Sequence, residues 1–224
     1  MTSSHRPPAQ RASQIICSSC PLLMAVFYTP TRDHPGAVQA MCSETQEGRT
    51  LVTFLSPMDG YLEAAYSSRY PERVYQVVPL ASFDPRSLMA HNGGRLVIHC
   101  TIGFAASDGR LITDANGRLC GYGLVESITI APDATLPWHL ELDPDIGKNF
   151  ERMHELAGLS AWQDTLAASW KWDEKKRLQE LAAAMAAIPG RAPSDAPLNQ
   201  VALYDPEFRQ WHFVNEADLD VIPA

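Results

Sequence analysis

Residues 95–130 constrain the fold of this chain more than any other stretch. They read RLVIHCTIGFAASDGRLITDANGRLCGYGLVESITI, in which apolar runs are interrupted by Asp-Gly at 108–109 and Asn-Gly at 116–117. Tight hairpin turns need positive φ angles, which these dipeptides adopt readily. The stretch therefore predicts three consecutive antiparallel strands with a short middle one. Gly121 and Gly123 predict a bulge or bend in the last of them.

Strand and helix patterns alternate in the rest of the chain. Continuous apolar runs at 22–28, 50–55 and 73–80 predict further strands. Residues 200–214, QVALYDPEFRQWHFV, predict a terminal hairpin around an Asp-Pro turn. These patterns predict a sheet whose strands are separated by helices.

A long helix is predicted near the C-terminus. Ser160 and Gln163 form a capping box in front of AWQDTLAASWKWDEKKRLQELAAAMAAI, and Pro189 ends the pattern. Trp162 and Trp170 share one face of this helix, whereas Trp172 falls off that face. We therefore expect Trp172 to be available to a partner.

The fold class expected from these elements is α+β. We expect a single domain in which a mixed or antiparallel sheet is covered by helices, with a long C-terminal helix and a terminal β-hairpin. A chain of 224 residues with 46% hydrophobic residues can build a full core. The predicted boundaries are a disordered tail at 1–14, an α+β domain at 15–188, a linker at 189–199, and a C-terminal hairpin at 200–224 that packs on the same domain.

The five cysteines of the sequence are an odd number for a disulfide scaffold. Cys17 and Cys20 have the C-x-x-C spacing of zinc ligands and redox dithiols, but a zinc site needs about four ligands. Cys42, Cys100 and Cys120 are isolated, and no histidine pair completes a site. We expect reduced, inert thiols, no metal, no cofactor and a cytoplasmic protein, with redox and metal roles as open alternatives.

Catalytic motifs are missing from the sequence. It contains no G-x-S-x-G, Walker loop, H-E-x-x-H or G-x-G-x-x-G pattern. His99 and Cys100 are adjacent on a predicted strand, so their side chains point to opposite faces and do not pair. We predict no catalytic residue. A hydrolase or nuclease that uses cysteine or carboxylate chemistry stays open as an alternative, and a deep pocket containing Cys100 or Glu141 would favour it.

Acidic residues concentrate at 141–151 and 215–220, and the net charge is −8. Such a surface repels nucleic acid and attracts a basic protein partner. The EF-hand pattern fails at 141–151, so ordinary solvated charge near a helix start is the alternative to a binding role. The predicted partner-binding residues are Glu141, Asp143, Asp145, Trp172, Glu216 and Asp218.

A family resemblance covers residues 20–115. The segments LVTFLSPMDGYLEAAYSSRY, VYQVVPLASFDPRSLM and GGRLVIHCTIGFAASDGRLI resemble the layout of the serine-sensitivity-enhancing protein family, whose relatives include immunity and accessory proteins of secreted toxins. The resemblance implies a bacterial, non-enzymatic protein. Its sharper form is an immunity protein that occludes the active site of a toxin, with a basic toxin domain as partner. A secretion-system adaptor is the second alternative.

No apolar stretch reaches the roughly 18 residues that a membrane-spanning helix needs. We therefore expect no membrane partner. The sequence leaves the oligomeric state open.

Overall fold

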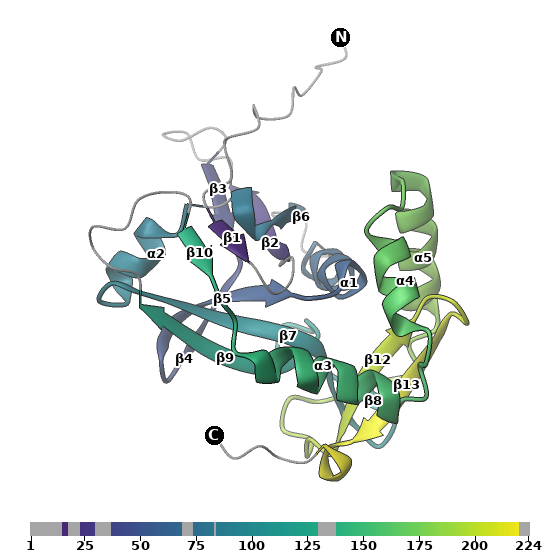
Figure 1. Ribbon diagram of the computed structural model, residues 1–224. Coiled ribbons are helices and arrows are strands. Elements are labelled where there is room, and N and C mark those ends of the chain that lie inside the picture. Colours follow the sequence, from purple (N-terminus) through teal and green to yellow (C-terminus); the bar gives the residue numbers. More distant parts are fainter. Residues whose placement is uncertain are drawn as a thin grey trace.

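A mixed, curled sheet organises the molecule (Figure 1). The computed structural model describes residues 15–17, 23–29, 37–68, 74–82, 84–129 and 138–219. The strands are β1 (Ile15–Cys17), β2 (Leu23–Thr29), β3 (Ala37–Ala40), β4 (Cys42–Thr45), β5 (Gly48–Phe54), β6 (Val74–Pro79), β7 (Arg95–Ser107), β8 (Arg110–Ile112), β9 (Gly121–Thr129), β10 (Trp138–Leu140), β11 (Arg191–Ala192), β12 (Gln200–Asp205) and β13 (Gln210–Asn215).

Five α-helices and two 3-10 turns accompany these strands in the described part of the chain. They are α1 (Pro57–Ser67), η1 (Leu80–Ser82), α2 (Arg86–His91), α3 (Pro144–Leu156), α4 (Trp162–Ser169), α5 (Glu174–Ala186) and η2 (Glu216–Asp218). Helices and a mixed sheet in one arrangement confirm the predicted single α+β domain.

Strand β7 is the centre of the sheet. It pairs in parallel with β5 and antiparallel with β8, β9 and β12. Strand β2 joins β5, β3 and β6, all antiparallel, and β1 pairs in parallel with β10 in a separate two-stranded sheet. The parallel β5–β7 pair is possible because α1, β6 and α2 lie between the two strands in the chain and supply the crossover.

A bulge in β7 changes which residues of the strand point to each face of the sheet. The register against β9 shifts between Thr101 and Gly103. Before the shift, Cys100 packs in the apolar cluster that α3 covers; after it, Phe104 packs in the cluster beneath α1 and α5. A Cβ atom at Gly123, opposite the bulge, would overlap the carbonyl oxygen of Cys100. The irregularity predicted at Gly121 and Gly123 thus lies in the partner strand β7, opposite Gly123, and it explains why β7 serves two cores.

The predicted hairpin at 108–109 is confirmed. Asp108 and Gly109 have φ angles of 49° and 72° and join β7 to β8. At the second turn Gly117 has a φ of 74°, but only Thr113 and Leu119 form a bridge there. Strand β9 then pairs along β7 instead of continuing along β8, since β7 is long enough to pair with both.

The predicted long C-terminal helix is wrong. The chain forms α4 and α5, which are separate helices, and α4 begins after Ala161 without a side-chain cap. The break occurs because Asp173 acts as the N-cap of α5, where its carboxylate accepts a hydrogen bond from the Lys176 amide at 2.7 Å. The charged DEKK stretch is thus a helix start and not a helix interior.

The terminal hairpin is confirmed by the antiparallel pairing of β12 with β13, and β12 also pairs with β7. Within the predicted linker at 189–199, β11 pairs in parallel with β8, and Ala192 is buried there. The predicted tail at 1–14 and Cys20 lie outside the described residues, as does the side chain of Cys17.

Candidate functional site

A cavity of about 400 Å³ lies where α3, α4 and the β12–β13 hairpin meet. Residues at the start of α1 and in the loop between α3 and α4 also line it. Helix α3 reaches this position because Ile146, Phe150 and Met153 follow a helical period and bury one face against the sheet. A cavity of this size with a mostly apolar lining is typical of a binding site.

Three rings in mutual contact, in tilted and edge-on geometry, form the aromatic wall of the cavity. The ring of His154 lies 4.4 Å from that of Phe150 and 4.7 Å from that of Trp162, centroid to centroid, and Phe150 meets Trp162 edge-on at 5.2 Å. His154 Nδ1 lies 2.8 Å from the carbonyl oxygen of Phe150, and since a carbonyl only accepts, Nδ1 carries the proton. Burial lowers the pKa of His154, against the opposing effects of this hydrogen bond and of the charge of Asp205.

A buried carboxylate, that of Asp205, faces the aromatic wall. The residue is 5% exposed, and its Oδ1 accepts a hydrogen bond of 2.8 Å from the Glu207 amide. Its Oδ2 lies 3.7 Å from His212 Nε2, which is itself 3.1 Å from the side-chain nitrogen of Gln210. Among the described residues no hydrogen-bond donor reaches Oδ2, so this oxygen remains available to a ligand.

Strand alternation places Asp205 inside the protein. Val201, Leu203 and Asp205 alternate along β12 and share a face, and the hairpin register sets His212 opposite Leu203. Pro206 follows Asp205 and supplies no backbone N–H, so the first donor of the turn comes from Glu207.

The hairpin tip separates this cavity from a second hollow. Phe208, at the tip, is 68% exposed and lines both. In the second hollow, Glu180 is fully buried and forms ion pairs with Lys176 at 2.7 Å and Arg209 at 2.9 Å. Although desolvation opposes ionisation, the hydrogen bonds from Arg209 and Lys176 lower the pKa of Glu180.

The cavity offers binding groups but no assembled nucleophile. Ser169 lines it, yet its hydroxyl donates to the carbonyl of Leu166 at 2.6 Å within the same helix. A nucleophile needs a base within hydrogen-bonding distance, and among the described lining residues there is no such pair. Over the described residues no group of His, Cys, Asp and Glu could hold a metal ion.

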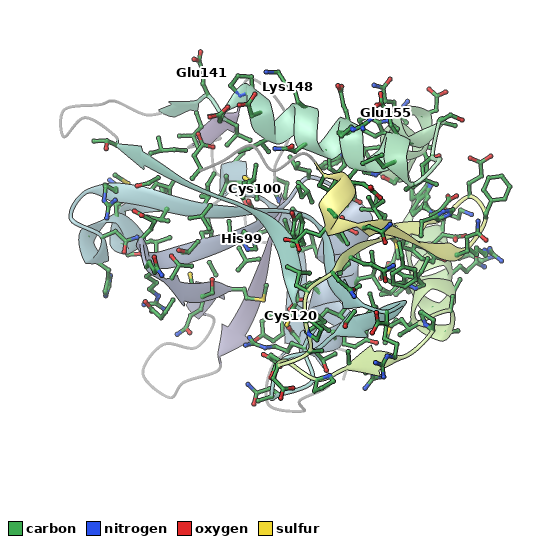
Figure 2. The ribbon with its side chains drawn as sticks, turned by 90° about the horizontal axis from the view of Figure 1, so that it is seen from below. His99, Cys100, Cys120, Glu141, Lys148 and Glu155 are labelled. Carbon is green, nitrogen blue, oxygen red and sulfur yellow. The ribbon has the colours of Figure 1, made fainter. Side chains whose placement is uncertain are left out.

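The described cysteine side chains, of Cys42, Cys100 and Cys120, and His99 do not line the cavity. Figure 2 shows His99 and Cys100 on opposite sides of β7, as predicted for adjacent strand residues. Cys100 is fully buried, 3.7 Å from the Thr53 hydroxyl, and burial raises the pKa of the Cys42 and Cys120 thiols. A raised pKa leaves less thiolate, so neither residue is an activated nucleophile.

The predicted acidic residues at 141–145 lie on and beside α3. Asp143 is the N-cap of α3 and accepts from the Asp145 amide at 2.8 Å, and Asp145 forms an ion pair of 2.6 Å with Lys148. Glu141 is exposed and has no ion pair among the described residues; in Figure 2 it points outward, as Lys148 and Glu155 do along α3. Two of the three carboxylates therefore have structural partners.

The other predicted partner-binding residues are dispersed. Trp172 is half-buried beneath Lys176, whose Nζ lies 5.6 Å from the ring, and it lines the second hollow. Glu216 and Asp218 lie in η2, where Asp218 accepts a hydrogen bond of 3.0 Å from Asn215. Neither these residues nor those at 141–145 line the main cavity.

Sequence reasoning missed Asp205, His154 and His212. A signal for Asp205 was present, since it continues the buried alternation of Val201 and Leu203 and a carboxylate on that face is unusual. No local signal connects His154 to it, because α3 and the hairpin are brought together only by packing.

No helix in the described part of the chain is long and apolar enough to cross a bilayer. A scan against protein-family models, a search of curated proteins and a search of solved structures each return no match to this chain.

Proposed function

We propose that the chain is a non-enzymatic protein-binding protein and that its partner docks on the cavity and the adjoining hairpin tip. The observation that carries the proposal is the open cavity of about 400 Å³ with an aromatic wall beside a phenylalanine that is 68% exposed. In its sharper form the protein is a cytoplasmic immunity protein that occludes the active site of a bacterial toxin, as the family resemblance implies.

An exposed apolar side chain at the cavity rim supports docking there. Phe208 is on the hairpin tip and lines the cavity. Large aromatic side chains at a pocket edge supply most of the binding free energy in many interfaces. Isolated exposed apolar residues are common on any protein, but Phe208 differs from them by its position at a cavity.

Charge supports a basic partner. The net charge is −8, and Glu141 and Glu155 are exposed along α3. Asp143 and Asp145 already have partners within the chain. They can therefore attract a basic protein over a distance, but we do not expect them to form direct ion pairs with it. Association should therefore slow as salt rises, since exposed charges are screened within about 10 Å at 0.1 M.

A hydrolase is the second candidate, favoured by the approach of His212 to Asp205 inside the cavity. Such a pair can activate water as a general base. Neither Cys100 nor Glu141, the residues named for this alternative, lines the cavity. A hydrolase would lose all turnover when His212 is replaced by Gln, whereas a docking protein has no turnover to lose.

The test is affinity capture of the full chain from a lysate of the source organism, with two variants. Phe208→Ala should weaken binding of the captured partner about thirtyfold, the effect of a hot-spot residue. Leu178→Ala is the matched control, because Leu178 is 59% exposed and lines a different groove, between α1 and α5. Equal affinities of both variants and the wild-type chain would contradict docking at the cavity, and a large multi-protein assembly would favour an adaptor.

A further inference from the structure

We propose that the cavity receives one arginine side chain of the partner protein, whose guanidinium is bound by the free oxygen of Asp205. This inference rests on the proposed function and specifies which side chain of the partner the cavity binds. A carboxylate beside aromatic rings binds guanidinium by paired hydrogen bonds and by contact of the cation with ring faces.

Two carboxylates, those of Asp205 and Glu207, line the cavity, and none of its described lining residues is a lysine or an arginine. Asp205 is 5% exposed, and burying a carboxylate is costly unless a cation or several donors compensate. Within the described chain its Oδ1 has one backbone donor and its Oδ2 has only His212, at 3.7 Å.

The arginine of the same hairpin is directed elsewhere. Arg209 follows Asp205 by one short turn, yet its guanidinium donates to both carboxylate oxygens of Glu180, at 2.9 Å and 3.3 Å. Arg209 of the hairpin is thus paired with Glu180 of α5. Asp205 of the hairpin is the carboxylate that an arginine of the partner can approach.

The ring of His154 completes the site. It donates from Nδ1 to a carbonyl, and burial lowers its pKa, which favours the uncharged form and reduces competition with a bound cation. A guanidinium presents parallel N–H donors to a carboxylate, a geometry that a lysine ammonium does not offer.

The probes are N-acetyl-arginine amide, N-acetyl-lysine amide and N-acetyl-citrulline amide, titrated into the full chain while the Trp162 indole resonance is followed by NMR. Citrulline has the shape of arginine without its charge. The arginine probe should shift the resonance at millimolar concentration, the lysine probe should bind more weakly, and citrulline should bind about tenfold more weakly or not at all. Equal binding of citrulline and arginine would overturn the inference without any substitution.

Asp205→Asn keeps the shape of the side chain and should weaken the arginine probe about tenfold or more. Asp164→Asn is the matched control, since Asp164 is exposed on α4 and does not line the cavity. An Asp205→Asn protein that is folded and binds the arginine probe as tightly as the control would refute the role of Asp205.

Agmatine, a guanidinium without a peptide backbone, distinguishes a free ligand from a protein side chain. If agmatine binds more than about tenfold more tightly than the arginine probe, the cavity is a small-cation site and the protein anchor is wrong. If no probe binds but Phe208→Ala still releases the captured partner, this inference fails while the proposed function stands. If the arginine probe binds but Phe208→Ala changes nothing, the proposed docking fails and the cation site stands.

Discussion

Helix α1 and the contact between α5 and the β12–β13 hairpin each bury a carboxyl group, but the pKa values of the two groups shift in opposite directions. Asp59 in α1 is 6% exposed, and burial raises its pKa from 3.8 to about 7. Glu180 in α5 is fully buried, yet the hydrogen bonds and charges of Arg209 and Lys176 outweigh desolvation and lower its pKa. Burial alone therefore does not set the charge of a carboxylate; the cations within hydrogen-bonding distance do.

A second carboxyl group of α1 repeats the pattern. Burial raises the pKa of Glu63 from 4.5 to about 7, although Ser67 donates to it at 3.0 Å. Arg118 is near enough to oppose the shift, but its own ion pair is with Asp114 at 2.8 Å. Asp205 differs from both in its contacts: His212 Nε2 lies 3.7 Å from Oδ2, one amide donates to Oδ1, and no lysine or arginine of the described chain pairs with it. Unlike Asp59, Asp205 lines the main cavity.

The largest expected effect is that of Asp59→Asn. The folded state holds the Asp59 proton more tightly, so this contribution to stability is complete below the unfolded pKa of 3.8 and is lost as the pH rises through about 7. Above that pH the buried charge costs about 2 to 4 kcal/mol, which the amide removes. Urea unfolding at about pH 8 should show the variant more stable than the wild type, and at about pH 4 the difference should vanish.

The matched control for Asp59→Asn is Asp164→Asn, the same change at an exposed position. Equal urea midpoints for the two variants at high pH would show that the Asp59 carboxylate is hydrated. The contrast between Asp59 and Glu180 would then be wrong.

Glu180→Gln should destabilise the protein near neutral pH, whereas Asp59→Asn stabilises it at high pH, and the change in the free energy of unfolding should be smaller. A lowered folded pKa contributes stability that is present above the unfolded value of 4.5 and is lost as the pH falls through the folded pKa. We expect a loss of about 1 to 2 kcal/mol near neutral pH, discounted because Lys176 and Arg209 are half exposed. Urea midpoints near neutral pH and in acid measure it, and a loss that persisted in acid would indicate packing and not charge.

Removing one cation at a time should matter less. Lys176→Gln and Arg209→Gln each leave Glu180 with one partner, at 2.9 Å or 2.7 Å, so each should lower the urea midpoint by less than Glu180→Gln does. The double variant should cost more than the sum of the two, because it leaves a buried carboxylate without a cation. Simple additivity in the double-mutant cycle would show that the two cations act independently.

The smallest effect is expected for Lys148→Ala. The ion pair of Lys148 with Asp145 is exposed, and such pairs rarely change stability measurably. An unchanged urea midpoint would sharpen the contrast with Glu180, whereas a clear loss would mean that this pair fixes the start of α3.

Parts of the fold with local determinants could be predicted from the sequence. The turn at Asp108-Gly109 follows from φ angles that these two residues adopt readily and that do not depend on the rest of the chain. The bulge in β7 is not local in this sense, because a Cβ atom at Gly123 would overlap the carbonyl oxygen of Cys100 on the neighbouring strand. The long helix failed because the capping tendency of Asp173 competed with a continuous apolar period. In α5, Leu178 is 59% exposed.

The sequence by itself determined the turns, the strand alternation, the terminal hairpin and the missing catalytic motifs, because each depends on neighbours in the chain. Only the tertiary structure decided the cavity. His154 comes from α3, Trp162 from α4, and Asp205 and His212 from the hairpin, and they meet because apolar faces pack together. The charge of a buried group likewise depends on which cation packing brings to it. Arg209 therefore pairs with Glu180 and not with Asp205, an outcome that no spacing along the chain encodes.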